Sequence, residues 1–311
     1  MKIINRIKHK AIKGFNNAYL MDKIIEQKIN YKIREEMLRN SALYSNEKGI
    51  EQFDEQNENI IISLTTYSKR IYDVYLVIES LLQQTHKPNK IILWLNENEF
   101  NEHTLPLVLK RQQTRGLAIS YCKDLKSYKK LIPALAKYSN HIIITIDDDV
   151  IYPFDMIENM YKEYLKDSQC IYYGRGHKMT WNKKGYLNHY QDWILEYSGE
   201  EKSHIHFPTG CSGILYPPHC FHEDISREDL FMKLAPNADD VWFKAMSLLK
   251  GFPCKKSLFS DNCIDIEKNQ DIALYNNNVK NNMNDIYIKQ VFDYYNLWVN
   301  LKSNKYDKEN Y

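Results

Sequence analysis

Short apolar runs alternate with segments of helical periodicity over residues 59–146, and this alternation constrains the fold more than any other feature of the sequence. The runs are rich in Ile and Leu, as buried strands are; they are Asn59–Leu64, Lys90–Leu95, Leu117–Cys122 and His141–Ile146. Strands and helices in regular alternation pair in parallel through right-handed crossovers. The sequence therefore predicts an α/β fold with a mainly parallel sheet flanked by helices.

The helices between and beyond these strands have less distinct limits. Asp73 is placed to cap a helix whose apolar residues follow the spacing of one buried face from Val74 to Leu82. Further helices are expected over Thr104–Arg111, Tyr128–Tyr138 with Pro133 as a kink or boundary, Phe154–Leu165, Asp239–Leu249 and Tyr287–Val299. Cys170–Tyr173 is expected to be a strand and Pro208–Tyr216 to return to the core, whereas Gly174–His206 shows no clear period.

Charge sets the N-terminal segment apart from the rest of the chain. Residues 1–40 contain ten Lys/Arg and four Asp/Glu, a net charge of +6, whereas the whole chain has a net charge of +2. We expect a basic helical extension and linker over residues 1–55, a main domain over 56–270 and a C-terminal helical segment over 271–311. The extension is interpreted either as a solvated helix packed on the domain or as an amphipathic helix resting on anionic lipid.

Composition restricts the cellular setting. The small net charge and the mean hydropathy of -0.58 do not indicate a nucleic-acid binder or an integral membrane protein. No apolar stretch approaches the ~18 residues that span a bilayer, and no apolar core follows the basic N-terminus. The six cysteines include no C-x-x-C pair and are expected to be reduced thiols. A cytoplasmic protein is predicted, with peripheral contact at the inner face of the membrane as an open alternative.

Three adjacent carboxylates, Asp147, Asp148 and Asp149, directly follow the strand His141–Ile146. Ligands of parallel sheets bind beyond the carboxyl ends of the strands, and three neighbouring carboxylates repel one another unless a cation lies among them. In an extended segment, Asp147 and Asp149 would face one ligand and Asp148 would point elsewhere. Their hard oxygen atoms suit Mg²⁺ or Mn²⁺. The alternative is an acidic surface turn without a ligand.

Six segments in a fixed order carry a family resemblance. They are Ser63–Ile71, Ser80–Leu95, Asp124–Leu135, Thr145–Pro153, Thr209–Pro218 and Asn237–Met246. Together they resemble the nucleotide-sugar glycosyltransferases of the GT-A fold, a Rossmann-like architecture, and especially the family 2-like bacterial enzymes of surface-polysaccharide synthesis. The resemblance covers roughly two-thirds of the chain, from Asn59 to Asp261, and each motif alone is weak.

The resemblance implies a role for each matching residue in binding the donor. Thr65, Tyr67 and Arg70 would lie along the nucleoside and phosphates, and Asp124 would contact the base or ribose. Either Lys129 or Lys130 would neutralise a diphosphate oxygen. Asp147 and Asp149 would hold the nucleotide and the metal, with Asp148 as a lesser donor-binding residue. Gly210 and Gly213 would let the backbone approach the donor sugar or the acceptor closely.

The resemblance also places the catalytic base in the pair Asp239 and Asp240, which would take a proton from the acceptor hydroxyl in an inverting reaction. We prefer Asp240 within the pair. The open alternative is that both acids only stabilise the start of a helix. Related enzymes often supply a further metal ligand from a late strand. Asp261, Asp265 or Glu267 is expected to substitute here, or else water fills the position.

The implied function is metal-dependent transfer of a sugar from a nucleotide-sugar donor, with UDP as the preferred nucleotide, to a glycan or lipid-linked acceptor in capsule- or lipopolysaccharide-type synthesis. Nucleotidyl transfer is a competing function, but Ser63–Arg70 lacks the Gly-rich loop usual for triphosphate binding. A non-catalytic carbohydrate-binding protein is a further alternative. Several aromatic residues are expected either to stack on sugar rings or to fill the core; they are Tyr172, Tyr173, Trp181, Tyr186, Tyr190 and Trp193.

Overall fold

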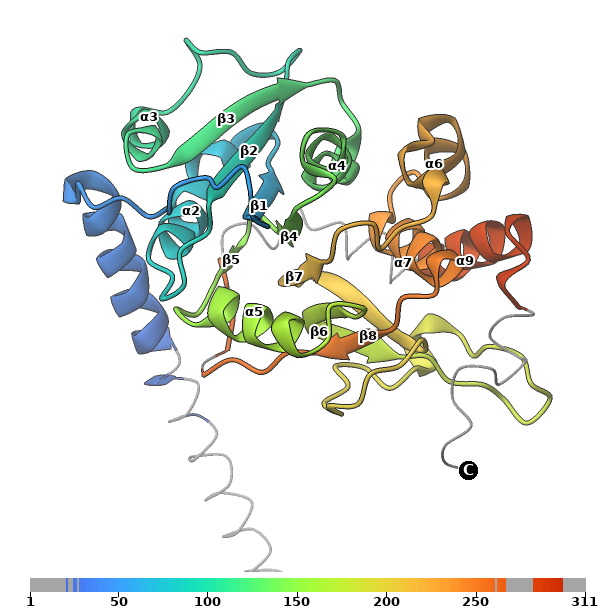
Figure 1. Ribbon diagram of the computed structural model, residues 1–311. Helices are drawn as coiled ribbons and strands as arrows, with labels where there is room; N and C mark the ends of the chain where they lie inside the picture. The colour runs from blue at the N-terminus through green and yellow to red at the C-terminus, as the bar shows by residue number, and fades with distance from the viewer. Residues whose placement is uncertain (1–20, 22–24, 27, 261, 267–281, 299–311) are drawn as a thin grey trace, which may run out of the picture. The chain divides into compact units, whose positions relative to one another are not determined.

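The computed structural model describes residues 21, 25–26, 28–260, 262–266 and 282–298 (Figure 1). The chain divides into two compact units, residues 1–45 and residues 46–311. In the first unit, residues 28–44 are helical, as the sequence predicts for this extension. The expected linker, Asn46–Asn59, belongs to the second unit and has no regular secondary structure.

The second unit is built on a seven-stranded mixed sheet with the strand order β3-β2-β1-β4-β7-β6-β8. Its strands in chain order are β1 (Ile60–Thr65), β2 (Lys90–Asn96), β3 (Leu117–Cys122), β4 (Ile142–Ile146), β6 (Ile171–Lys178), β7 (His206–Tyr216) and β8 (Cys254–Lys256). The first four are mutually parallel, whereas β7 runs antiparallel to β4 and to β6. A second, two-stranded sheet pairs β5 (Val150–Ile151) with β9 (Ile264–Asp265).

Helices connect and cover the strands. The α-helices are α2 (Val74–Leu82), α3 (Leu107–Gln113), α4 (Ile132–Tyr138), α5 (Met156–Lys166), α6 (Glu228–Leu234), α7 (Asp239–Lys250) and α9 (Met283–Tyr294). The short 3-10 helices are η1 (Ser68–Tyr72), η2 (Lys126–Lys130), η3 (Tyr190–Asp192) and η4 (Glu223–Ser226). The fold class predicted from the sequence, an α/β architecture with a mainly parallel sheet and flanking helices, is therefore confirmed.

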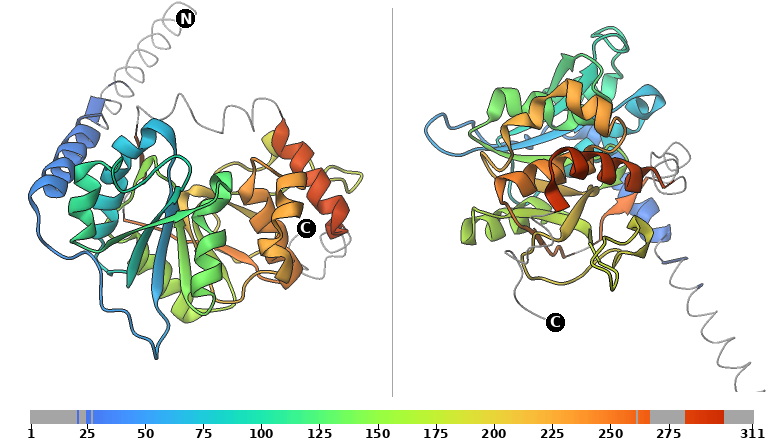
Figure 2. Two further views of the ribbon diagram at one scale, coloured as in Figure 1. Left: turned by 90° about the horizontal axis from the view of Figure 1, so that it is seen from above. Right: turned by 90° about the vertical axis from the view of Figure 1, so that its right-hand side faces the viewer.

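The main hydrophobic core lies on one face of this sheet. Ile61 of β1 belongs to it, together with buried residues of α4, α6, α7 and α9. Neighbouring side chains of a strand point to opposite faces, and Ile60 and Ile62 are buried outside this cluster. Figures 1 and 2 show α7 in orange and α9 in red side by side on the core face. The start of α7 is thereby held beside the sheet.

Several predicted limits shift for local reasons. Asp73 occupies the N-cap position of α2, but its side chain makes no capping hydrogen bond, so the predicted cap is wrong. The helix expected from Thr104 begins at Leu107 because Pro106 takes an extended ψ of 138° and disfavours helical geometry in the residue before it. Pro133 lies in the first turn of α4, after η2, and thus acts as a boundary rather than a kink.

The strand expected at Cys170–Tyr173 is longer than predicted. It begins at Ile171, continues to Lys178 and changes register against β7 between Tyr173 and Arg175. An irregularity of this kind leaves one residue unpaired and redirects the following side chains, so the sequence pattern loses its period there. The last helix, Met283–Tyr294, begins earlier than the predicted Tyr287.

The structure also bears on the expectations for the cysteines and for membrane-spanning helices. The six cysteines are free thiols, as predicted. Among the residues that the structure describes, no helix combines the length and apolar composition needed to cross a bilayer.

Candidate active site

A large open pocket of about 1220 Å³ lies where β1 and β4 end, and α7 begins at its wall. All the site residues predicted from the sequence line it except Gly213; they are Thr65, Tyr67, Arg70, Asp124, Lys129, Lys130, Asp147, Asp148, Asp149, Gly210, Asp239 and Asp240. The parallel strands bring segments far apart in the chain to one edge of the sheet. The predicted clustering at the carboxyl edge is therefore observed.

The acidic triplet lies in a turn between β4 and β5, so the extended geometry expected for it is wrong. Asp148 is buried and accepts hydrogen bonds from Arg70 Nη1 at 2.6 Å and from Thr66 Oγ1 at 2.5 Å. Asp149 is also an ion-pair partner of Arg70, with 3.0 Å between Oδ2 and Nη1. Asp148 therefore anchors the turn. Asp147 pairs with Lys130, whereas Asp149 pairs with Arg70.

The surroundings of Asp149 disfavour the charged form of its carboxyl group. Burial, followed by the charges of Asp147 and Asp148, raises the pKa of Asp149 to about 7, although Arg70 opposes this shift. Asp265 of β9 is paired with Val150 in the two-stranded sheet. Its negative charge also raises the pKa of Asp149. Of the three candidates for a further metal ligand, Asp265 lines the pocket, whereas Asp261 and Glu267 lie outside the described residues.

Lys130 connects the triplet to the acidic pair of α7. Its Nζ lies 3.0 Å from Asp147 Oδ1, 2.9 Å from Asp239 Oδ2 and 4.0 Å from Asp240 Oδ1. Burial disfavours the charged amine, yet the three carboxylates hold the pKa of Lys130 well above its ordinary value. A side chain that is only 7% exposed and faces three acids is directed away from solvent and toward the protein.

The two acids of α7 are not equivalent. The Asp239 side chain is 9% exposed and forms the shorter ion pair with Lys130, whereas the Asp240 side chain is 28% exposed. Asp240 Oδ2 also accepts a hydrogen bond from the Gly210 backbone N–H at 3.3 Å. Burial, then Asp239 and Asp147, raises the pKa of Asp240 to about 7 against the effect of Lys130. Asp240 is thus the more accessible carboxylate and the better placed to exchange a proton near neutral pH.

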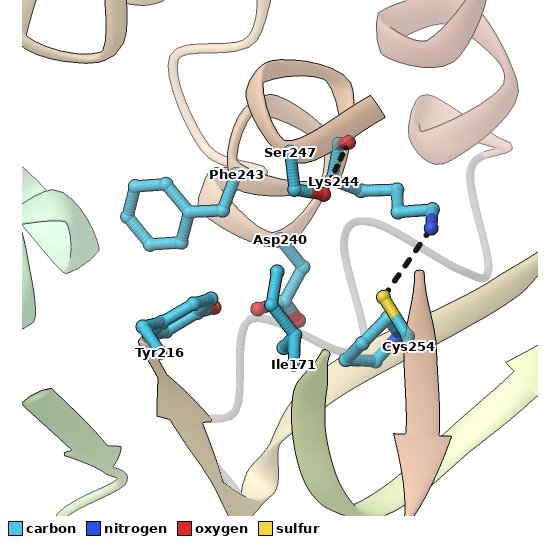
Figure 3. Close-up of a pocket in the computed structure, with 8 residues that line it drawn as sticks. Ile171, Tyr216, Asp240, Phe243, Lys244, Ser247 and Cys254 are labelled. Carbon is cyan, nitrogen blue, oxygen red and sulfur yellow. Dashed lines mark hydrogen bonds between the residues drawn. The ribbon is translucent and has the colours of Figure 1, made fainter. Parts of the chain in front are cut away.

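Behind Asp240 the packing is dense. Asp240 also borders a small pocket of only about 10 Å³, close to the space that one water needs. Figure 3 shows Phe243 and Tyr216 on one side of Asp240 and Lys244 with Cys254 on the other. The Lys244 amine contacts the Cys254 thiol at 3.4 Å.

The raised pKa of Asp240 predicts a change in stability with pH. In the unfolded chain this carboxyl ionises near 3.8 and in the folded protein near 7, so folding loses stability as the pH rises through this window. Asp240→Asn removes the penalty. Unfolding by urea in EDTA should therefore show the variant more stable than wild type by roughly 4 kcal/mol at pH 8, and nearly equal at pH 4. A difference that does not depend on pH would contradict the assignment.

The remaining predicted donor-side residues are held by neighbours. Lys129 donates to Asp124 Oδ1 at 2.5 Å; this hydrogen bond, together with the Lys126 backbone N–H, lowers the pKa of Asp124 despite slight burial. The Arg70 guanidinium lies 5.2 Å from the centre of the Tyr67 ring. Thr65 Oγ1 donates to the Trp94 carbonyl at 2.8 Å. Asp124 remains half exposed and able to accept from a ligand.

The two predicted glycines have different surroundings. A Cβ on Gly210 would lie 2.6 Å from Lys130 Nζ and 3.0 Å from Asp147 Oδ1, so a side chain would displace the ion pair. Gly213 has a φ of +81°, and its Cβ would contact Met156 Sδ at 3.1 Å instead of the pocket. The backbone conformation is a sufficient reason for glycine at position 213. Its predicted contact with substrate stays a prediction.

Sequence reasoning missed residues whose role depends on tertiary contacts. Thr66 fixes Asp148, and the Tyr152 hydroxyl accepts the Asp147 backbone N–H at 3.1 Å. Arg175 lines the pocket just after the irregularity in β6 and pairs with Glu196 at 3.0 Å. The adjacent T-T-Y stretch could have indicated Thr66, because hydroxyls at a strand end commonly orient acids. Arg175 gives no comparable signal.

The aromatic residues divide between the two roles left open by the sequence. Tyr190 lines the pocket beside Phe207, with 5.9 Å between ring centres and nearly perpendicular planes. Tyr172, Tyr173 and Trp193 are buried in the core. Core packing accounts for Tyr172, Tyr173 and Trp193, and Trp181 is partly buried against the core. Sugar stacking remains a prediction for Tyr190 and for the exposed Tyr186.

A divalent cation fits the chemistry of this pocket. Nine acidic and six basic side chains line it, which gives a formal charge of -3 at a place where a nucleoside diphosphate would add more negative charge. The described residues contain no preformed cluster of three or more metal-ligand side chains. Mg²⁺ and Mn²⁺ sites for nucleotides need only one or two carboxylates, since phosphate oxygens and water complete the coordination. Asp149 and Asp147 would supply those carboxylates, with Asp265 as the candidate third.

Comparisons with known proteins give only remote structural similarity. No protein-family model and no curated protein matches the sequence. The chain is similar to the crystal structure of GalNAc-T7 with UDP, GalNAc and Mn²⁺, with a TM-score of 0.44 and 8% identity over 66% of this chain and 42% of that chain. It is also similar to S. aureus TarS 1-349, with a TM-score of 0.42 and 15% identity over 66% and 58%. The chain thus spans less than two-thirds of either protein, and similarity at this level carries no functional argument.

Proposed function

We propose that the protein is a metal-dependent glycosyltransferase of the GT-A fold that moves a sugar from a nucleotide-sugar donor to a hydroxyl of a glycan or lipid-linked acceptor. One observation carries the proposal. The strand-end acids Asp147 and Asp149 and the helix-start acid Asp240 line one large pocket, in which Lys130 contacts Asp147 and Asp239. A metal-bound leaving group and a general base are the two functions that such a transfer requires.

The donor would occupy the side of the pocket formed by the ends of β1 and β4. Asp124 offers acceptor oxygens to a base or ribose, and the Tyr67 ring offers an apolar surface beside Arg70. Asp149 and Asp147 would hold the cation, which when bound stabilises the negative charge of the departing nucleoside diphosphate. UDP is our preferred nucleotide, and Mn²⁺ or Mg²⁺ our preferred cation.

The acceptor would enter beside the start of α7. Asp240 accepts the proton of the attacking hydroxyl, and its pKa of about 7 allows this exchange near neutral pH. The reaction would invert the anomeric centre if the hydroxyl attacks on the face opposite the departing nucleoside diphosphate, and an inverting reaction is part of the proposal. A polysaccharide acceptor of capsule or lipopolysaccharide type is part of the same proposal, which the family resemblance supports.

A donor screen separates this function from the alternatives. Purified protein with Mn²⁺ is incubated in separate reactions, one with common nucleotide-sugars and one with a nucleoside triphosphate and a sugar 1-phosphate, and the released products are identified. A glycosyltransferase releases a nucleoside diphosphate, whereas a nucleotidyltransferase consumes a nucleoside triphosphate and releases pyrophosphate. A non-catalytic carbohydrate-binding protein releases neither above the rate without enzyme. Pyrophosphate as the product would overturn the proposal in favour of nucleotidyl transfer.

We also propose that the N-terminal unit contacts an anionic membrane surface. Five apolar residues, each about half exposed, recur every fourth position; they are Met21, Ile25, Ile29, Ile33 and Met37. Residues 1–40 carry a net charge of +6, which attracts anionic headgroups while an apolar stripe inserts between them. This contact would place the enzyme next to a lipid-linked acceptor in the cytoplasm.

Vesicle sedimentation tests the membrane contact. The full chain should bind vesicles of phosphatidylglycerol and phosphatidylcholine, bind pure phosphatidylcholine weakly and dissociate at high salt. Ile29→Glu should weaken binding roughly tenfold because a buried Ile contributes ~1.5–3 kcal/mol. Asn30→Glu adds the same charge beside the stripe and is the matched control. Equal loss in the two variants would show that charge alone drives binding and would contradict insertion of the stripe.

A further inference from the structure

Hydrogen bonds to the central strands hold the backbone of Lys130 in place. Its backbone carbonyl accepts the Ser63 hydroxyl at 2.6 Å, and Ser63 Oγ in turn accepts Trp94 Nε1 at 2.9 Å. Ser63 and Trp94 are buried residues of β1 and β2. The end of η2 is therefore tied to two central strands, and the Lys130 stem has a defined origin.

The amine end is equally defined. Lys130 Nζ lies between Asp147 and Asp239, at 3.0 Å and 2.9 Å, and the missing side chain of Gly210 leaves room for it, since a Cβ there would be 2.6 Å away. Asp147 directly follows the last residue of β4, and Asp239 is the first residue of α7. A cation that contacts both sets the spacing between these elements.

We infer that Lys130 is a positioning residue that holds the donor-side acid Asp147 at a fixed distance from the acid pair Asp239–Asp240, and that it does not bind the donor phosphate. This role rests on the proposed function. Two unscreened acidic groups in one buried wall would repel each other, and the amine neutralises that repulsion in the presence and absence of donor. It also occupies one oxygen of Asp147, which leaves fewer carboxylate oxygens for a divalent cation.

Binding of Mn²⁺ alone and of UDP with Mn²⁺, measured on the whole chain, distinguishes this role from phosphate binding. Lys130→Met removes a positive charge beside Asp147 and releases its oxygen, so Mn²⁺ should bind roughly tenfold more tightly than to wild type. If Lys130 instead binds the donor phosphate, Lys130→Met should bind UDP in the presence of Mn²⁺ more weakly than wild type, whereas the positioning role predicts UDP binding at least as tight as in wild type. Weaker binding of UDP would overturn the inference.

Kinetics with saturating donor supply a second readout. Lys130→Met should lower kcat by about 10²-fold, the loss typical of misplaced catalytic groups, with little change in the donor KM. Lys130→Arg keeps the charge and should restore part of kcat. Gly210→Ala displaces the amine without altering any charge and should lower kcat in the same way. A rise in donor KM with unchanged kcat in Lys130→Met would contradict the positioning role.

Thermal unfolding separates failure of this inference from failure of the proposed function. In EDTA, the loss of Tm caused by Lys130→Met should be much smaller in an Asp147→Asn background, because the pair is then already broken. Lys244→Met removes a buried lysine that contacts Cys254 rather than an acid, and its effect should be independent of Asp147. If wild type transfers no sugar, the proposed function is wrong; if the two substitutions are additive, the contact with Lys130 is wrong.

Discussion

Asp240→Asn is expected to lower sugar transfer by about 10³-fold while leaving the affinity for nucleoside diphosphate and Mn²⁺ almost unchanged. Asn keeps the shape of the side chain and the contact with the Gly210 backbone N–H, but it cannot take a proton from the acceptor. Because Asp240 is 28% exposed and Asp239 only 9%, the larger loss should fall on position 240. The measurement is the initial rate of nucleoside diphosphate release with donor and acceptor present.

Two further variants, Asp192→Asn and Asp239→Asn, show whether the loss of activity is specific to position 240. Asp192→Asn changes an exposed acid outside the pocket and should retain wild-type activity. Asp239→Asn should reduce activity through Lys130, which loses an ion-pair partner at 2.9 Å, but by less than Asp240→Asn. Full transfer by Asp240→Asn together with its loss in Asp239→Asn would move the role of base to Asp239. Full transfer by both would show that the acids only stabilise the helix start.

UDP together with Mn²⁺ should raise the melting temperature by roughly 5 °C at ligand concentrations about 100-fold above Kd, a stabilisation of about 2.7 kcal/mol. UDP alone should have much less effect, because the pocket has an excess of acidic side chains, nine against six basic ones. The cation screens that charge before the diphosphate can enter. If no common nucleoside diphosphate with metal shifts the melting temperature, the donor site is refuted.

Substitution of the candidate ligands shows which acids bind the cation that produces the shift in melting temperature. Asp149→Asn should lose most of the Mn²⁺-dependent shift, yet at pH 8 in EDTA it should melt higher than wild type, because the variant no longer ionises a carboxyl whose pKa burial and neighbouring acids raise to about 7. Asp265→Asn reports on the further ligand. A partial loss of the shift would identify Asp265 as a ligand, and an unchanged shift would leave that position to water.

The alternation of strands and helices predicted the fold class correctly, because the periodicity of apolar residues depends only on neighbouring positions in the sequence. The four predicted strands correspond to β1, β2, β3 and β4, with limits that differ by at most one residue. Once four parallel strands are expected, the polar residues at their carboxyl ends must share one edge. For that reason Asp124, Asp147 and Asp149 were placed in one pocket without any knowledge of tertiary contacts.

Prediction failed where geometry depended on partners distant in sequence. The triplet forms a turn because Arg70 and Thr66 hold Asp148 inside the protein, and no local pattern announces such a contact. Arg175 faces the pocket because β6 changes register before it, which hides the strand period. The expectation that Lys129 or Lys130 neutralises a diphosphate oxygen stays a prediction, and the structure adds that the Lys130 charge is paired with two acids.

The sequence by itself determined the α/β fold class, the sheet edge that carries the site and the acids gathered there, because these follow from apolar spacing and from the direction of parallel strands. Only the tertiary structure decided which acid is buried, which is accessible and which cation lies between them. Those properties depend on distances across the pocket and on the exclusion of water, which raise the pKa of Asp149 and of Asp240 to about 7. Neither the distances across the pocket nor the burial of an individual acid follows from the spacing of residues along the chain.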